Sequence, residues 1–340
     1  MERRTTRAIA AVLIILAAPA APALGAGDLV VGRLTLVEAS EAVPYAYWYY
    51  VPESVLDGRV AGLVWHATPG GTDPDDPVFW ARFDLPQFLA CRPGWAKPPI
   101  DLPEEHGLIL FSIAVPRPAV AFYESCTGIS VGFPDALSSL GNPGALDASY
   151  HDPDLRALAS IGDLERRLST AGIRFDARLF LTGVYRGAEW AHRFALLHPD
   201  RIRAVAPVAG NVYTIPVTAL DDGPLPWPLG LAGFESLGRG SIDWPTYLGI
   251  PYYVTTSIHE TLWYNRMTPE EQGIEGRHLL RYVECFGSIP PEREASFAEA
   301  LLAVGLDVQL IWSEGGHGWT DPVRIRVFEF FASFERLSGP

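Results

Sequence analysis

The chain has 340 residues, of which 48% are hydrophobic, and it contains 16 Phe, 13 Tyr and 10 Trp. This apolar content suits a folded core of one or at most two domains, and the low charged fraction of 19% argues against a disordered chain. The formal net charge of −14 argues against nucleic acid or an anionic membrane surface as a partner, because both are negatively charged.

Residues 1–26 have the pattern of a secretory signal peptide. Three arginines within the first seven residues precede an apolar run over 8–18, and a small-residue stretch, APAAPALGAG, follows. The apolar run is too short to span a bilayer comfortably. We therefore predict cleavage after residue 25 or 26, export to the periplasm or the cell exterior, and no integral membrane segment in the mature chain. The alternative is an uncleaved N-terminal anchor.

The rest of the chain alternates between strand and helix patterns. Alternating apolar residues at 29–39 and 44–53 predict antiparallel strands. Nearly continuous apolar runs, typical of parallel strands buried on both faces, follow at 62–67, 107–115, 177–183, 202–210, 251–257 and 307–313. Helical patterns separate most of them, at 152–172, 188–199, 292–305 and 321–337. We therefore predict one α/β domain over 27–340, with a doubly wound, mostly parallel sheet of about eight strands.

Residues 211–251 break this alternation because they are rich in Pro, Gly and Trp and too long for an ordinary connection. We predict that they form a cap insertion over the carboxyl edge of the sheet, where such folds bind ligands. An ordered surface loop without a role is the alternative. The aromatic residues expected to line a pocket under the cap are Trp227, Trp244, Tyr247, Trp263 and Tyr264.

A glycine-bounded turn, Gly183-Val184-Tyr185-Arg186-Gly187, joins a predicted strand to a predicted helix. In a nucleophile elbow the central residue is strained, and the N–H of the next residue, here Arg186, helps to form an oxyanion hole. A tyrosine oxygen lies roughly 6.5 Å from its Cα, against roughly 2.4 Å for serine, and a phenol ionises only near pH 10. We therefore expect Tyr185 to be a plug or binding residue. A tyrosine nucleophile and an ordinary packed turn remain as alternatives.

Residues 178–211 resemble the elbow, helix and next strand of the α/β-hydrolase superfamily, in its secreted esterase and depolymerase-like branch. Glu260, in IHETLWYN, occupies the position of that family's acid, and His317, in EGGHGW, that of its catalytic histidine. The resemblance therefore implies a catalytic set of Tyr185, Glu260 and His317, with the elbow serine replaced. The alternatives are a solvent-facing carboxylate for Glu260 and a backbone-bonded loop histidine for His317.

The same resemblance extends to the early strand and loop GLVWHATPGG, at 62–71. In the family this loop supplies the other oxyanion donor, and here Ala67 replaces the usual glycine after His66. The resemblance implies oxyanion or binding roles for His66, Ala67 and Arg186.

Neither a metal nor a cofactor is predicted. The acidic turn at 73–76 lacks the spacing of a calcium loop, and the sequence contains no phosphate loop, dinucleotide fingerprint or zinc motif. Of the three cysteines, Cys91 and Cys126 are candidates for a disulfide in an oxidising compartment, although each can equally be a buried small hydrophobe. The third, Cys285, lacks an evident histidine partner.

Two functions follow from these patterns. The first is a secreted α/β-hydrolase-like protein with a degenerate triad, which lacks ordinary serine-hydrolase turnover and binds a small-molecule or polymer ligand in the former active-site pocket. The alternative is an active carboxylic-ester hydrolase that uses His317 and Glu260 with an atypical nucleophile or an activated water. The sequence does not fix the oligomeric state.

Overall fold

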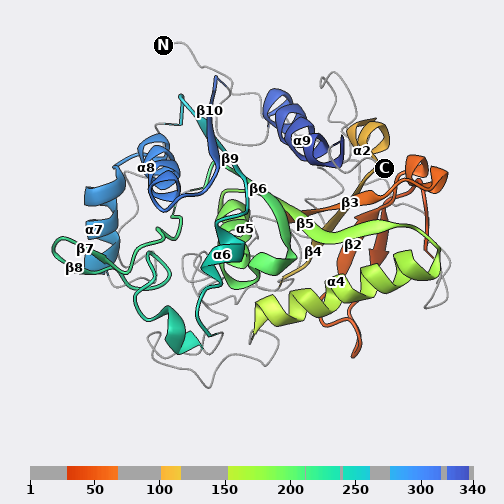
Figure 1. Ribbon diagram of the computed structural model, residues 1–340, viewed down its shortest axis with the longest axis horizontal. Coiled ribbons are helices and arrows are strands. Elements are labelled where there is room, and N and C mark those ends of the chain that lie inside the picture. Colours follow the sequence, from red (N-terminus) through yellow and green to blue (C-terminus); the bar gives the residue numbers. More distant parts are fainter. Residues whose placement is uncertain are drawn as a thin grey trace, which may run out of the picture.

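Figure 1 shows the computed structural model of the chain, in which a mixed sheet is flanked by helices. The structure describes residues 29–67, 101–115, 152–210, 212–237, 240–260, 276–314 and 320–336. The strands of the main sheet, in chain order, are β1 (Thr35–Val37), β2 (Tyr47–Tyr50), β3 (Ala61–Ala67), β4 (Leu108–Ile113), β5 (Phe175–Val184), β6 (Ile202–Val208), β9 (Tyr252–Ser257) and β10 (Val308–Ser313).

The strands lie in the order β1-β2-β4-β3-β5-β6-β9-β10. Strand β2 runs antiparallel to both of its neighbours, and all other neighbouring pairs are parallel. The predicted sheet of about eight mostly parallel strands, with antiparallel strands at its N-terminal side, is therefore confirmed. Because β3, β5, β6, β9 and β10 run in the same direction, the segments that follow them meet at one carboxyl edge.

Helices cover both faces of the sheet (Figure 1). On one face α4 (Pro153–Thr170), α5 (Arg186–Leu197) and α8 (Pro290–Ala303) bury their apolar sides in the larger core cluster. On the other face α9 (Asp321–Arg336) and α2 (Asp101–His106) contribute to a second core cluster. The four predicted helices are confirmed, with ends that differ by a few residues.

Several smaller elements were not predicted. They are the helices α2, α6 (Trp244–Tyr247) and α7 (Gly276–Phe286), the 3-10 turns η1 (Glu53–Asp57), η4 (Pro199–Arg201) and η5 (Phe234–Leu237), and a hairpin of β7 (Ala219–Leu220) and β8 (Gly223–Pro224). The predicted signal peptide at 1–26 lies outside the described residues. No helix in the described part of the chain is both long enough and apolar enough to cross a membrane.

The segment after β6 is bound to α5 through a buried polar face of that helix. The Val212 N–H donates to Glu189 Oε1 at 2.9 Å, and the Arg193 guanidinium donates to the Val212 carbonyl at 2.8 Å. Arg193 Nε also donates to Thr214 Oγ1 at 3.0 Å. Glu189, His192 and Arg193 occupy one face because residues three and four positions apart are neighbours on a helix. All three side chains are buried, so this segment is part of the core.

His192 adds a further contact to the same face. Its Nε2 lies 2.8 Å from the Thr214 carbonyl and therefore carries the proton, while Nδ1 lies 3.2 Å from the Tyr252 hydroxyl. Burial lowers the pKa of His192 to about 3, against a smaller raising effect of the bond to Thr214. The imidazole is thus a neutral group with a structural role.

Helix α7 holds the β7–β8 hairpin, and the two lie side by side in Figure 1. Arg281 donates to the carbonyls of Pro224, at 2.6 Å, and Gly223, at 2.8 Å, and forms an ion pair with Asp222. The Tyr282 hydroxyl donates to the Tyr213 carbonyl at 3.0 Å. Two segments that are distant in the sequence, one after β6 and one after β9, therefore form one structural unit.

The later part of the predicted cap, which includes α6, lies at the amino-terminal edge of the sheet and not over its carboxyl edge. Strand β9 is parallel to β6, so the connection must return to the amino-terminal edge, and α6 packs there against η4. Tyr247, expected to line a ligand pocket, is fully buried, and its ring meets Trp244 edge-on at 5.8 Å. That expectation is wrong for Tyr247, because the ring fills the core below the sheet edge. Trp263 and Tyr264 lie outside the described residues.

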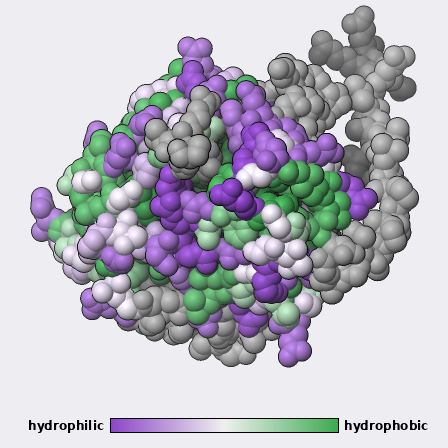
Figure 2. Space-filling model, turned by 45° about the vertical axis from the view of Figure 1, so that its right-hand side comes forward, coloured by the Kyte–Doolittle hydropathy of each residue, from purple (hydrophilic) through white to green (hydrophobic). Residues whose placement is uncertain are grey.

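Figure 2 shows one face of the molecule, on which apolar and polar side chains both reach the surface. Within the described ranges, the exposed large apolar side chains are spread over many different elements and loops. They are Leu56, Val60, Leu155, Ile258, Leu302, Trp312 and Ile325. Scattered residues of this kind are ordinary on a protein surface and do not mark a docking site.

We predict that Arg193→Met lowers the free energy of unfolding by about 3–5 kcal/mol, because it leaves buried acceptors and the Glu189 carboxylate without their guanidinium. Urea unfolding of the full chain measures the change. The matched control is Arg166→Met, which removes an ion pair with Asp163 from a side chain that is 62% exposed. It should cost less than about 1 kcal/mol. Equal losses in the two variants would contradict the anchoring role of Arg193.

Candidate active site

The turn between β5 and α5 has the strained backbone expected of an elbow. Tyr185 has φ 54° and ψ −112°, a combination that residues other than glycine rarely adopt. Backbone strain of this kind costs roughly 1–3 kcal/mol and persists only where the surrounding structure enforces it. Here the Tyr185 N–H donates to the Val208 carbonyl, and the Tyr185 carbonyl accepts from the N–H groups of Ala188 and Glu189. The turn is therefore fixed from both sides.

Gly183 permits the close approach of helix and strand that this turn requires. A Cβ atom at this position would lie 2.4 Å from the carbonyl carbon and oxygen of Gly187 and 2.8 Å from the Ala67 carbonyl oxygen. All of these are backbone atoms, which cannot move aside as a flexible side chain can. Gly183 therefore has a steric role in this turn.

The end of β3 lies directly beside the turn. Ala67 is the register partner of Gly183, and His66 is the partner of Thr182. Both His66 and Ala67 are buried, at 2% and 4% exposure. The backbone that precedes the loop with the implied oxyanion donor is therefore adjacent to the elbow, while the loop itself, from residue 68, lies outside the described residues. Arg186, the other implied donor, is the first residue of α5.

The end of β6, on the other side of the elbow, is also strained. Ala209 has φ 49°, and its N–H donates to the Thr255 carbonyl of β9. The next residue, Gly210, donates its N–H to the Tyr213 hydroxyl at 3.1 Å, and the Tyr213 ring lies so close that a Cβ at Gly210 would meet it at 2.3 Å. Strained residues that cluster at one sheet edge favour a functional site there.

Glu260 lies three residues past the end of β9, at the same carboxyl edge, with 3% of its surface exposed. Its buried position argues against the alternative of a solvent-facing carboxylate. Strands β5 and β9 are separated by β6 alone, so the ends of these two strands, which Tyr185 and Glu260 follow, are about 10 Å apart by ordinary strand spacing. His317, the third member of the implied set, lies outside the described residues, after the end of β10.

The structure also brings to this edge a carboxyl group that sequence reasoning missed. Glu294, in the first turns of α8, is completely buried. Burial raises the pKa of Glu294 well above its ordinary value, and the Thr256 hydroxyl lowers it only in part. Glu260 raises this pKa further, so the two carboxyl groups interact. In the sequence, Glu294 sits among the polar residues of a helix and gives no sign of its burial.

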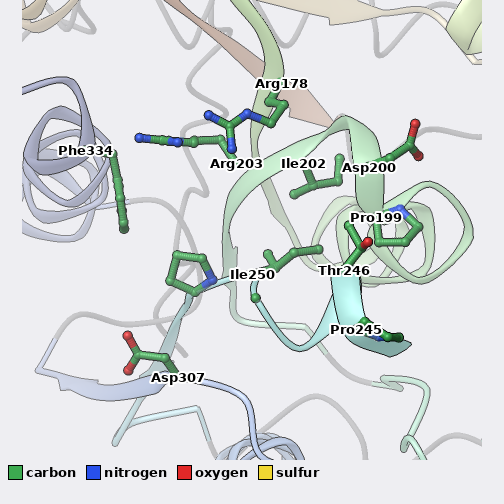
Figure 3. A pocket seen from close by; sticks show the side chains of 12 residues that line it. Arg178, Pro199, Asp200, Ile202, Arg203, Pro245, Thr246, Ile250, Asp307 and Phe334 are labelled. Atoms are coloured by element: carbon green, nitrogen blue, oxygen red, sulfur yellow. The ribbon is translucent and has the colours of Figure 1, made fainter. Parts of the chain in front are cut away.

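A pocket of about 570 Å³ lies at the opposite, amino-terminal edge of the sheet. Figure 3 shows Arg178 and Arg203 extending from neighbouring strands, with Phe334 across from them. Arg178 is paired with Asp176 at 2.9 Å, and the Arg203 guanidinium lies 5.9 Å from the centre of the Phe334 ring. These arginines already have partners, and the pocket is separated from the elbow by the length of the strands. It is not part of the candidate site.

No group of three or more His, Cys, Asp or Glu side chains in the described ranges is arranged to hold a metal ion. The acidic turn at 73–76 lies outside those ranges, as do Cys91 and Cys126. Cys285 is exposed on α7.

No protein-family model matches the sequence, and no curated protein is similar to it. Solved structures do share its fold. Poly(aspartic acid) hydrolase-1 from Sphingomonas sp. KT-1 superposes with a TM-score of 0.53 at 14% identity, over 89% of this chain and 98% of that one. The coverage of both chains and the strand order together show that this chain has the α/β-hydrolase fold.

Two further structures are similar at lower scores. An S-formylglutathione hydrolase from Agrobacterium tumefaciens has a TM-score of 0.45 at 13% identity, over 90% of this chain and 95% of that one. Carboxyl esterase 2 from Tuber melanosporum has a TM-score of 0.47 at 12% identity, over 94% and 89%. Both TM-scores are too low to add evidence on the fold.

We predict opposite effects for two glycine-to-alanine changes. Gly183→Ala should lower the free energy of unfolding by about 1–3 kcal/mol or more, because the new Cβ meets backbone of α5 and β3. Gly162→Ala, in the interior of α4 where a Cβ meets nothing within 4 Å, should raise it by about 0.5–1 kcal/mol. Urea unfolding measures both. A neutral Gly183→Ala would show that α5 does not depend on the close approach.

Proposed function

We propose that this chain is an exported α/β-hydrolase-like protein that lacks ordinary serine-hydrolase turnover and binds a ligand at the carboxyl edge of its sheet. The observation that carries the proposal is the strained turn at Tyr185, which keeps the backbone of an elbow around a residue with the wrong side chain. A phenol oxygen overshoots the place where a short hydroxyl would attack a carbonyl carbon. In this proposal Tyr185 is the plug or binding residue of the former site.

The surroundings of Tyr185 support a binding role. Its side chain is partly buried and packs against the core cluster on the α9 side of the sheet. The phenol thus has an apolar body that is held in place and one polar atom at its end, a combination that suits ligand contact. In this proposal Glu260 and His317 serve as polar residues of the binding site, and His66, Ala67 and Arg186 keep the binding roles that the resemblance implies.

The ligand class is a small molecule or a polymer with little negative charge. The structural neighbour named above hydrolyses poly(aspartic acid), which is a polyanion. Our chain has a formal net charge of −14, and this charge would repel such a substrate. We therefore do not carry that substrate over to this protein.

The test uses the mature chain with a panel of short and medium acyl esters of p-nitrophenol. Wild type should stay at the background rate. Tyr185→Ser should gain a rate roughly tenfold or more above background, because the turn already presents the residue beside the oxyanion donors. A fluorophosphonate probe should label Tyr185→Ser and leave wild type unlabelled.

Two controls separate the alternatives. Tyr185→Ala opens the same space without a hydroxyl and should gain neither rate nor labelling. Adding His317→Ala to Tyr185→Ser should abolish the gain. A strong wild-type rate that His317→Ala removes would instead establish the active hydrolase, with water or an atypical nucleophile. An inert Tyr185→Ser would contradict the idea that this turn is a preserved catalytic frame.

A further inference from the structure

Buried charges gather around Tyr213 and Tyr282 on the α5 side of the carboxyl edge. The carboxyl groups are Glu189, Glu260 and Glu294, and the guanidinium groups are Arg193 and Arg293, each with 3% or less of its surface exposed. They come from α5, α8 and the segment after β9. Their charges change the pKa values of the two phenols or of one another.

This cluster has more acids than bases among the residues described. Arg193 lies 3.9 Å from Glu189, and Arg293 lies beside Glu294 but donates to the Gly287 carbonyl at 3.2 Å. An uncompensated buried charge costs several kcal/mol, so one carboxyl group is expected to bind a proton instead.

Glu294 is the carboxyl group best placed to hold that proton. Neither of its oxygens makes a hydrogen bond of ordinary geometry with another described residue, and the same is true of the Thr256 hydroxyl near it. An ionised carboxylate requires several such bonds when buried. The nearby Gly210 N–H donates to the Tyr213 hydroxyl at 3.1 Å, and its effect in lowering the pKa of Glu294 is smaller than the raising effect of burial. Ionised Glu294 would therefore be poorly stabilised.

We propose that Glu294 is a positioning residue of the candidate site, a neutral carboxyl group that leaves Glu260 as the charged member of the pair. When two carboxyl groups interact, the group whose surroundings stabilise a charge less well binds the proton. The other group stays ionised. The inference rests on the proposed function only in taking Glu260 as the acid of the site.

The first test measures the protonation of Glu294 directly. Difference infrared spectra of wild type and Glu294→Gln at neutral pH should show the carbonyl band of a protonated carboxyl group in wild type only. The matched control, Glu299→Gln, changes an exposed carboxylate on the same helix and should leave that band in place. Absence of the band in wild type would overturn the proposal.

The second test follows stability against pH. A raised folded-state pKa means that the folded protein holds the proton more tightly than the unfolded chain, so stability is complete below the ordinary pKa of glutamate and falls as pH rises. Glu294→Gln, which is neutral at every pH, should match wild type near pH 4 and become increasingly more stable than wild type toward about pH 8. Glu299→Gln should show no such divergence. A constant difference at all pH values would overturn the proposal.

The third test shows that Glu294 and Glu260 are coupled. In Glu260→Gln the repulsion on Glu294 is removed, so the pH at which the carbonyl band disappears should move down by about one unit or more. An unchanged titration would leave Glu294 as a buried acid without a positioning role and would overturn the proposal. None of these measurements uses esterase activity, so an inert Tyr185→Ser would contradict the proposed function without affecting them.

Discussion

The contact between β5 and α5 at Gly183 is the constraint on which the rest of the site depends. Without a Cβ at this position, the helix starts directly above the strand end and Tyr185 is forced into a positive φ. Neighbouring strands then complete the edge, since Ala67 of β3 pairs with Gly183 and Val208 of β6 accepts from Tyr185. The local geometry is set by the backbone, and it therefore tolerates a side chain that is unsuited to serine chemistry.

The polar face of α5 explains how the long irregular segment after β6 can be part of the core. Glu189, His192 and Arg193 supply the hydrogen bonds that the irregular backbone of 212–214 would otherwise lack when buried. Arg281 and Tyr282 of α7 donate hydrogen bonds to this same segment. Polar contacts thus join the segment after β6 to α7, which follows β9 in the chain.

The order of the main strands and helices could be predicted from the sequence because each buried strand is a short continuous apolar run. The elbow could be located because Gly183 and Gly187 flank a strand-to-helix boundary. The burial of Glu294 at the candidate site could not be predicted, because the sequence of α8 does not show which of its polar residues faces β9. The prediction that Tyr247 lines a ligand pocket was wrong. The sequence of a Trp-rich segment does not show whether an aromatic side chain lines a pocket or packs in the core.

The elbow also bears on how such a protein can change over time. The strain at Tyr185 is imposed by Gly183, by Val208 and by the start of α5, none of which depends on the phenol. Tyrosine and serine codons can differ by one base, so a single mutation can exchange a long hydroxyl for a short one without a new turn having to evolve. The backbone of this turn would therefore hold a serine in the same place as the tyrosine.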